Sequence, residues 1–378
     1  MARKTRESDQ KVEAANPPVT ARRRNYRRML GIAILMGMSS LITYLIMSGQ
    51  AGQPLHYSTV SSKIEPTAPL RDFKVINAHE HLFSEQYLAK YFEAAPKAGI
   101  VRTLFVASSE YTLKGSPCSP EKGNDENTEA ILEVARKYPG KIIPFCTIHP
   151  GDPDKLEKIK KYVAQGAKGL KLYSGHGNFH DRPLDAAEML PVYAYCAETG
   201  LPICWHVNIL KYGDEFVRVM AKFPNMKVIV PHFGVTFFAP QQQPFRDFQT
   251  LLDTYPNMYT DTSFGTREIL VTGLEAVSQN TEIFRAFFAK YSDRIFYGTD
   301  MVITGNKEKT PEWIEAVLRA CRDVLEKDVY YFYMGARGSP YADARANNIY
   351  GVYRGLALDD ATLKKVYETN IQKLFPSP

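Results

Sequence analysis

"FKVINAHEH" (residues 73–81) joins a short apolar run, typical of a β-strand, to two histidines at its end, His79 and His81. Side chains two residues apart on a strand point to the same face of a sheet. We therefore expect the two imidazoles to lie side by side. By itself the pair is weak support for a metal site, because most histidines are surface residues or hydrogen-bonded core residues.

Seven further strand-like runs follow the first, and helix-like segments separate them. The runs are "IVRTLFVAS" (100–108), "KIIPFCTIHP" (141–150), "GLKLYSG" (169–175), "PICWHVN" (202–208), "KVIVPHFG" (227–234), "MYTDTSF" (258–264) and "RIFYGTD" (294–300). Several of the helix-like segments, such as 127–140, 152–166 and 185–200, begin with Asp or Asn and end with Gly, which are common helix caps. This alternation indicates an α/β protein with a parallel sheet. Eight units over about 250 residues predict a TIM (β/α)8 barrel.

A doubly wound open sheet is the alternative fold. It is less well supported, because neither glycine-rich phosphate-binding motif, GxGxxG or GxxxxGK[ST], follows the first strand. We predict that the barrel domain occupies residues 70–378. Amphipathic helices are expected at 311–328 and 359–375, with a Tyr-rich insertion between them at 329–355. The insertion is consistent with a lid over the barrel mouth, a contact in a homodimer or a packed surface segment.

The net positive charge of the chain belongs to its N-terminal end. Residues 1–28 contain nine Lys or Arg and three Asp or Glu, whereas the rest of the 378-residue chain contains 38 basic and 38 acidic residues. A nucleic-acid-binding domain usually carries an excess of basic residues on one face. We therefore expect no nucleic-acid partner. The apolar content of 44% is typical of a globular protein with a substantial core.

Residues 29–47, "MLGIAILMGMSSLITYLIM", contain no charged residue. As a helix rising about 1.5 Å per residue, this segment is long enough to cross the ~30 Å apolar core of a bilayer. The basic run "RRRNYRR" stands directly before it, which predicts a cytoplasmic tail at 1–28 and an extracytoplasmic barrel beyond a linker at 48–69. An uncleaved, single-pass signal anchor is favoured. The alternative is an export signal that is cleaved near Ala51, since "SGQAG" resembles a cleavage site and "RRNYRR" loosely resembles a twin-arginine signal.

Polar residues follow the strand-like runs at the end where barrel enzymes place their active sites. Seven of the eight histidines lie at a strand end or in the loop after it, and His56 is the exception. The residues of interest are His79, His81, His149, Lys171, His206, His232 and Asp300. Several nitrogen and oxygen donors at one barrel mouth predict a divalent metal, with zinc the best match and iron or manganese as alternatives.

The sequence at this point resembles the amidohydrolase superfamily, and within it the amidohydrolase-2 branch that includes amino-carboxymuconate-semialdehyde decarboxylase. The matching motifs are "INAHEHL", "GAKGLKLY", "PICWHVN", "VIVPHFG", "YGTDM" and "YETNIQKLF", in family order from about residue 70 to 376. Each motif is weak alone, and the ordered set is specific. The resemblance implies that His79, His81, His206 and Asp300 bind the metal and that His232 is the catalytic histidine beside it.

Three histidines and one carboxylate leave a coordination position for water, which is typical of a catalytic metal site. A bound zinc ion lowers the pKa of water from ~15.7 to about 7. Asp300 is then expected to orient the water and accept its proton, and His232 to stabilise an oxyanion or protonate the leaving group. These roles predict hydrolysis of an amide, ester or lactone of a small molecule. The alternatives are decarboxylation of an unsaturated or aromatic acid on the same site and, less favoured, a non-catalytic barrel.

Four further residues are candidates with open roles. Lys171 is either a carboxylated lysine that bridges two metals, as elsewhere in the superfamily, or a cation that binds a substrate carboxylate or closes an ion pair. His149 and His176 are expected to line the substrate pocket, although histidines in loops are often only solvated. Arg267, in "SFGTRE", is a candidate contact for a planar anion because its guanidinium group matches a carboxylate.

Overall fold

The eight strand-like runs form one sheet in which each strand pairs in parallel with its neighbours in chain order. The structure is a computed structural model that describes residues 57–59, 69–108, 123–265, 268–333 and 349–376. The strands are β2 (Val75–His81), β3 (Ile100–Val106), β4 (Ile142–Thr147), β5 (Gly169–Gly175), β6 (Ile203–Val207), β7 (Val228–Val230), β8 (Met258–Asp261) and β9 (Ile295–Phe296). Every predicted strand is therefore confirmed.

Backbone hydrogen bonds close the sheet into a ring. Ala78 N donates to Tyr297 O at 2.7 Å, and Asp300 N donates to His79 O at 2.9 Å, so the segment directly after the last strand bonds to the first strand. A parallel sheet whose first and last strands are joined has no free edge. The predicted TIM (β/α)8 barrel is confirmed, and closure brings the loop after β9 against the end of β2.

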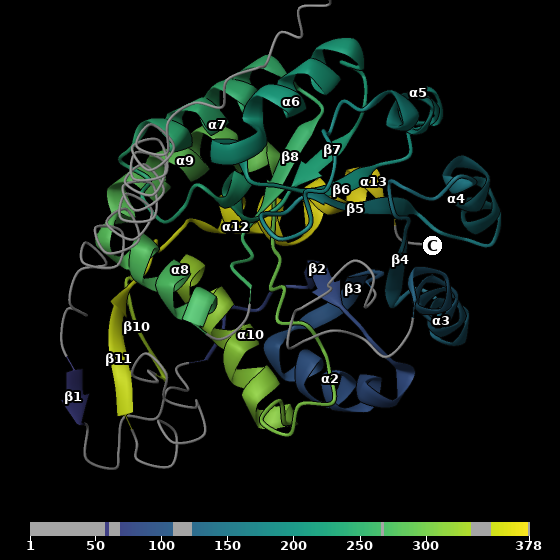
Figure 1. The fold of residues 1–378 in the computed structure, drawn as a ribbon. Coiled ribbons are helices and arrows are strands. Elements are labelled where there is room, and N and C mark those ends of the chain that lie inside the picture. Colours follow the sequence, from purple (N-terminus) through teal and green to yellow (C-terminus); the bar gives the residue numbers. More distant parts are fainter. Residues whose placement is uncertain (1–56, 60–68, 109–122, 266–267, 334–348, 377–378) are drawn as a thin grey trace, which may run out of the picture. The chain divides into compact units, whose positions relative to one another are not determined.

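Helices surround the strands, as Figure 1 shows. Those that follow β2 to β8 are α2 (Leu88–Ala94), α3 (Asn124–Lys137), α4 (Lys155–Ala164), α5 (Leu190–Thr199), α6 (Ile209–Lys222), α7 (Gln243–Thr254), α8 (Glu268–Gln279) and α9 (Thr281–Tyr291). Beyond β9 lie α10 (Pro311–Glu326), α12 (Asp360–Lys364), a π-helical turn (Lys365–Thr369) and α13 (Asn370–Leu374). Both helices predicted in the C-terminal part are present.

Two apolar layers hold the barrel together. The larger one lies between the strands and the helices, and the smaller one contains residues such as Ile76, Leu104 and Phe296. Ile371 and Phe375, at the C-terminal end of the chain, belong to the smaller layer, and Phe375 O accepts a hydrogen bond from Arg102 at 2.7 Å. These contacts join the end of α13 to β3 and to the apolar interior of the barrel.

One expected helix cap has a different role. The sequence predicts a helix that opens at Asn127, but α3 begins one turn earlier, at Asn124. Asn127 is fully buried, accepts the backbone N–H of Ser108 at 2.7 Å and donates to the carbonyl oxygens of Leu82 and Phe83. Its side chain therefore ties α3 to the ends of β2 and β3 at the barrel mouth.

The Tyr-rich insertion provides the two arms of an antiparallel hairpin, β10 (Val329–Tyr333) and β11 (Ile349–Arg354). β11 also pairs with β1 (Tyr57–Thr59), a strand within the predicted linker, and Arg354 N donates to Ser278 Oγ of α8. Residues 334–348 lie outside the described part of the chain. The alternatives of a lid, a homodimer contact and a surface segment therefore stay open.

Among the described residues, no helix is both long enough and apolar enough to cross a bilayer. The segment expected to do so, residues 29–47, lies outside them. The transmembrane helix stays a prediction from the sequence.

Candidate metal centre

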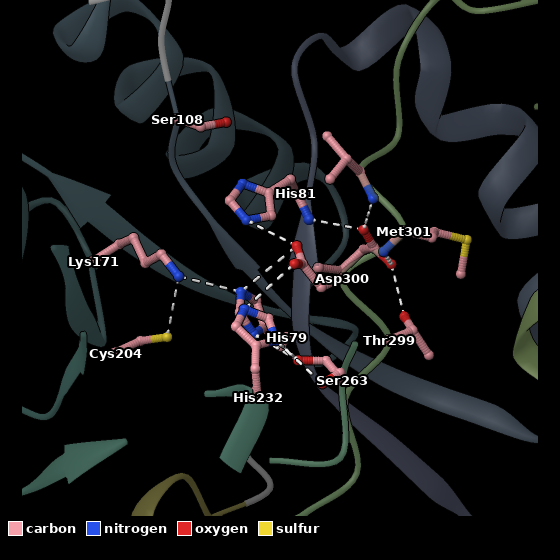
Figure 2. Close-up of polar contacts among 12 residues, drawn as sticks. His79, His81, Ser108, Lys171, Cys204, His232, Ser263, Thr299, Asp300 and Met301 are labelled. Carbon is pink, nitrogen blue, oxygen red and sulfur yellow. Dashed lines mark hydrogen bonds and ion pairs between the residues drawn. The ribbon is translucent and has the colours of Figure 1, made fainter. Parts of the chain in front are cut away.

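Strand ends position the central polar residues of the barrel mouth. His79 and His81 are on β2, Lys171 is on β5, His232 lies two residues beyond the end of β7, and Asp300 lies in the segment after β9. Figure 2 shows the Asp300 side chain pointing toward the rings of His81, His79 and His232. The sequence prediction that these segments converge is consistent with this arrangement.

Asp300 lies at the centre of the group. Its Oδ1 is 3.2 Å from His81 Nε2 and 3.8 Å from His79 Nε2, and its Oδ2 is 3.5 Å from His232 Nε2. One ligand atom from each of His79, His232 and Asp300 lies within 4.8 Å of the others, a spacing that one metal ion can span. The ring centroids of His79 and His81 are 5.5 Å apart, as expected for residues on one side of a strand.

A buried carboxylate fixes the orientation of His79. Asp261, at the end of β8, is fully buried, and its Oδ2 lies 2.8 Å from His79 Nδ1. A carboxylate only accepts hydrogen bonds, so Nδ1 carries the proton and Nε2 is left with its lone pair toward Asp300. A carboxylate behind a histidine is a common support for a metal ligand, because it sets both the ring orientation and the tautomer.

The same carboxylate holds His232 through the backbone. Asp261 Oδ1 accepts the N–H groups of His232 at 3.1 Å and of Ser263 at 3.0 Å. His232 Nδ1 donates to Ser263 O at 3.1 Å, which leaves its Nε2 unprotonated and facing Asp300. His232 has a backbone φ of 57°, a left-handed conformation that non-glycine residues rarely adopt and that occurs often at functional sites.

His81 is oriented by a tyrosine. The Tyr173 hydroxyl donates to Ala107 O at 2.8 Å, so its oxygen is free to accept from His81 Nδ1 at 3.3 Å. His81 Nε2 is then the third unprotonated nitrogen that faces Asp300. Asp300 Oδ1 is buried, and none of the described residues forms a hydrogen bond with it. The Nε2 lone pairs of His81 and His232 meet the carboxylate with no proton between them, and that of His79 faces both Asp300 and Lys171 Nζ. This donor set fits a bound cation, and imidazole and carboxylate ligands suit zinc.

The electrostatics of the group favour the protonation states that bind metal. Burial lowers the pKa of His81 to about 4 and also lowers the pKa of His232 below its ordinary value. Burial by itself would raise the pKa of Asp300, yet the neighbouring His79, His81 and His232 bring it well below its usual range. His81 and His232 are therefore neutral and Asp300 is ionised near pH 7, as a metal site requires.

Lys171 lies beside this group and is almost completely buried. Its Nζ is 3.2 Å from His79 Nε2 and 3.6 Å from Cys204 Sγ, and it lies 5.1 Å from the centre of the Tyr173 ring. Figure 2 shows the lysine reaching His79 from the side away from Asp300. Within the described part of the chain, Lys171 forms no ion pair with a carboxylate.

The remaining candidate residues lie at different distances from the centre. The His206 ring centroid is 4.9 Å from that of His232 and 4.5 Å from that of His176, so both residues adjoin the group. The His206 nitrogens are not part of the compact group of ligand atoms, where His232 stands instead. His149 Nε2 is 3.5 Å from Asp181 Oδ2, and its role in substrate binding stays a prediction. Arg267 lies outside the described residues.

Sequence reasoning did not identify Asp261, Ser263 or Tyr173 as part of the centre. The sequence did contain an indication for Asp261. It is a carboxylate at the end of the strand-like run "MYTDTSF", and a position at a strand end was the criterion by which the histidines were selected. Tyr173 follows Lys171 by two residues on β5 and therefore shares its face.

The family model for amidohydrolases, of the amidohydrolase-2 type, matches residues 76–377. The chain belongs to the amidohydrolase-2 family. This confirms the resemblance drawn from the six motifs. Among curated proteins, none has a significant sequence match to this chain.

Solved structures with the same barrel include a probable 2-pyrone-4,6-dicarboxylic acid hydrolase from Acinetobacter baumannii with citric acid bound. It has a TM-score of 0.52 and 14% identity, and the match covers 80% of this chain and 99% of that chain. An amidohydrolase from Burkholderia multivorans with bound zinc has a TM-score of 0.51 and 12% identity, with coverage of 81% and 100%. At these identities the two structures support the fold alone.

Proposed function

We propose that this amidohydrolase-2 protein is a metal-dependent hydrolase that cleaves an amide, ester or lactone bond of a small molecule. The observation that carries the proposal is the convergence of the Nε2 atoms of His79, His81 and His232 on the carboxylate of Asp300. The zinc in the structurally similar amidohydrolase from Burkholderia multivorans supports zinc as the metal. Iron and manganese are the alternatives.

The fourth protein ligand is proposed to be either His206 or His232. The resemblance favours His206 as the ligand and His232 as the catalytic residue, whereas the compact geometry favours His232 as the ligand. Both arrangements keep His79, His81 and Asp300 as ligands. They differ in which single substitution removes the metal, and this difference is testable.

A divalent metal, held by His79, His81, Asp300 and one further histidine, would acidify water and polarise a substrate carbonyl. Asp300, held ionised by the histidines, accepts a proton from the attacking water as its oxygen bonds to the carbonyl carbon. The proton then passes to the leaving nitrogen or oxygen as the scissile bond breaks. His232, when it is not a ligand, lies 3.5 Å from Asp300 and relays that proton.

Lys171 supports a substrate with a negatively charged group. Its buried Nζ contacts His79 Nε2 and Cys204 Sγ, and no carboxylate among the described residues pairs with it, so an anionic substrate group would be a matching partner. We therefore propose that the hydrolysed molecule carries a carboxylate, which Lys171 contacts.

The test is metal analysis of the purified full chain, followed by turnover assays on carboxylate-bearing esters, lactones and amides. The hydrolase proposal predicts about one equivalent of divalent metal and release of acid from one substrate class. His79→Ala and Asp300→Ala are expected to abolish turnover while circular dichroism shows an intact fold. Release of CO₂ from unsaturated or aromatic acids would instead favour the decarboxylase. A metal-free, inactive wild-type chain would favour the non-catalytic barrel.

For the location of the enzyme we propose a single-pass membrane anchor at residues 29–47 with the barrel on the extracytoplasmic side. The uncharged run and the basic "RRRNYRR" before it support this arrangement. Protease protection of the barrel in inverted membrane vesicles, but not in spheroplasts, is the expected result. Recovery of a shortened chain in the soluble extracytoplasmic fraction would favour signal cleavage instead.

A further inference from the structure

Glu80 stands between the two histidines of β2 but does not join them around Asp300. Its side chain is fully buried, and burial raises its pKa to about 7. The register of β2 against β3 shifts between Asn77 and Glu80, so the strand is irregular at this point. A buried carboxyl group next to a metal centre needs hydrogen-bond donors around it.

The donors come mainly from the loop that carries Asp300. Glu80 Oε1 accepts the backbone N–H of Val302 at 2.8 Å and that of His81 at 2.9 Å. Oε2 accepts the hydroxyl of Thr299 at 2.8 Å and the N–H of Met301 at 3.3 Å. Glu80 thus binds the residue before Asp300 and the two residues after it. Figure 2 shows Thr299 and Met301 beside Asp300, on the side away from Lys171.

The backbone of this loop is strained. Asp300 has a φ of 49° and Val302 a φ of 58°, and both lie in the left-handed region that non-glycine residues rarely occupy. Valine is especially unfavourable there because it is branched at Cβ. Such conformations persist only where the surrounding contacts hold them.

Lys309 binds the carbonyl groups of the same segment. Its Nζ donates to Met301 O and to Val302 O, both at 2.6 Å, and the side chain is 3% exposed. The carboxyl group of Glu80 therefore holds the N–H groups of these two residues while the ammonium group of Lys309 holds their carbonyl oxygens. His79 O fixes the remaining N–H, that of Asp300, at 2.9 Å.

We propose that Glu80 is the positioning residue of Asp300: by accepting the N–H groups of Met301 and Val302 and the hydroxyl of Thr299, it holds the loop in the left-handed turn that aims the aspartate at the histidines. The inference rests on the proposed metal-dependent function. Without Glu80, the loop relaxes to an ordinary backbone conformation and Asp300 moves away from the metal.

Cobalt(II) binding by the full chain tests this role, because the visible spectrum of Co²⁺ reports its coordination geometry. Glu80→Leu removes all four contacts, and Glu80→Gln keeps the Oε1 contacts but places an NH₂ group against Met301 N–H. The matched control is Asn370→Ala, which removes two buried hydrogen bonds, to Ser292 O and Ile295 O, at the other end of β9. It is expected to lower the melting temperature without changing the site.

We expect Glu80→Leu to bind Co²⁺ about 10- to 100-fold more weakly than the wild type and to show an altered visible spectrum, as for loss of other groups that support metal ligands. Glu80→Gln is expected to shift both readouts in the same direction by a smaller amount, and Asn370→Ala to change neither. Wild-type affinity and spectrum in either folded Glu80 variant would overturn the inference and leave the hydrolase proposal standing. A wild-type chain that binds no Co²⁺ or Zn²⁺ would overturn both.

Discussion

Replacing Asp261 with asparagine tests how the centre prepares its ligands. In the wild type, Oδ2 accepts the proton of His79 Nδ1 at 2.8 Å while Oδ1 accepts two backbone N–H groups. Asparagine has only one carbonyl oxygen. If that oxygen keeps the hydrogen bonds from the two backbone N–H groups, the NH₂ group of the asparagine faces His79 Nδ1. Two donors then oppose each other, and the imidazole relieves the conflict by moving its proton to Nε2, the atom that should bind the metal.

The expected magnitude follows from that exchange. To bind metal through Nε2, His79 of the variant must move its proton back to Nδ1, where this buried N–H has no acceptor. An unpaired buried donor costs about 1–3 kcal/mol. This corresponds to roughly a tenfold to hundredfold weaker metal affinity, the range known for loss of groups that support metal ligands. The volume and the fold are unchanged, so the melting temperature of the metal-free protein is expected to move little.

The assay is competition for Zn²⁺ between the protein and a chromophoric chelator. Asp253→Asn is the matched control, because Asp253 also accepts a tyrosine hydroxyl and lies on α7 with its side chain about half exposed, paired with Lys290. We expect wild-type zinc affinity in the control. Equal affinities for Asp261→Asn and the wild type would refute the tautomer argument and leave His79 without a demonstrated role as a ligand.

Three further predictions follow from the site and its scaffold. Comparing His206→Ala with His232→Ala separates the ligand from the catalytic residue. The variant that lacks a ligand should lose bound metal, and the variant that lacks the catalytic residue should keep the metal and lose turnover. If both variants keep the metal and the turnover of the wild type, the proposed centre is contradicted. Gly234→Ala should lower the free energy of unfolding by about 1–3 kcal/mol, because Gly234 has a φ of +65° and a Cβ there would lie 2.7 Å from Ile209 and Phe248. Gly213→Ala, in α6 with only an ordinary 3.5 Å contact, should leave stability equal or higher in denaturant unfolding, and equal losses at both glycines would contradict this reasoning. Zinc at about 100 times its dissociation constant should stabilise the wild type by about 2.7 kcal/mol, so a melting temperature insensitive to chelator would count against a built-in site.

The fold and the inner residues of the centre could be predicted because both depend on local patterns. Each strand is a short apolar run, and the residue that ends it must lie at the barrel mouth, which placed His79, His81, His232 and Asp300 together. The identity of the eight strands required no knowledge of long-range contacts.

The supporting groups could not be predicted in the same way, because each acts through a partner far away in the sequence. Asp261 and His79 are 182 residues apart, and Glu80 and Val302 are 222 residues apart. Barrel closure creates both contacts. Whether His206 or His232 lies closer to Asp300 depends on the left-handed backbone at His232, which a local pattern does not reveal because non-glycine residues seldom adopt it.

X-ray absorption at the zinc edge, on the full chain loaded with one equivalent of Zn²⁺, measures the central feature most directly. We predict a first shell of nitrogen and oxygen at about 2.0–2.1 Å with the outer-shell scattering of several imidazoles. A sulfur ligand at about 2.3 Å, or failure to retain zinc at all, would contradict it.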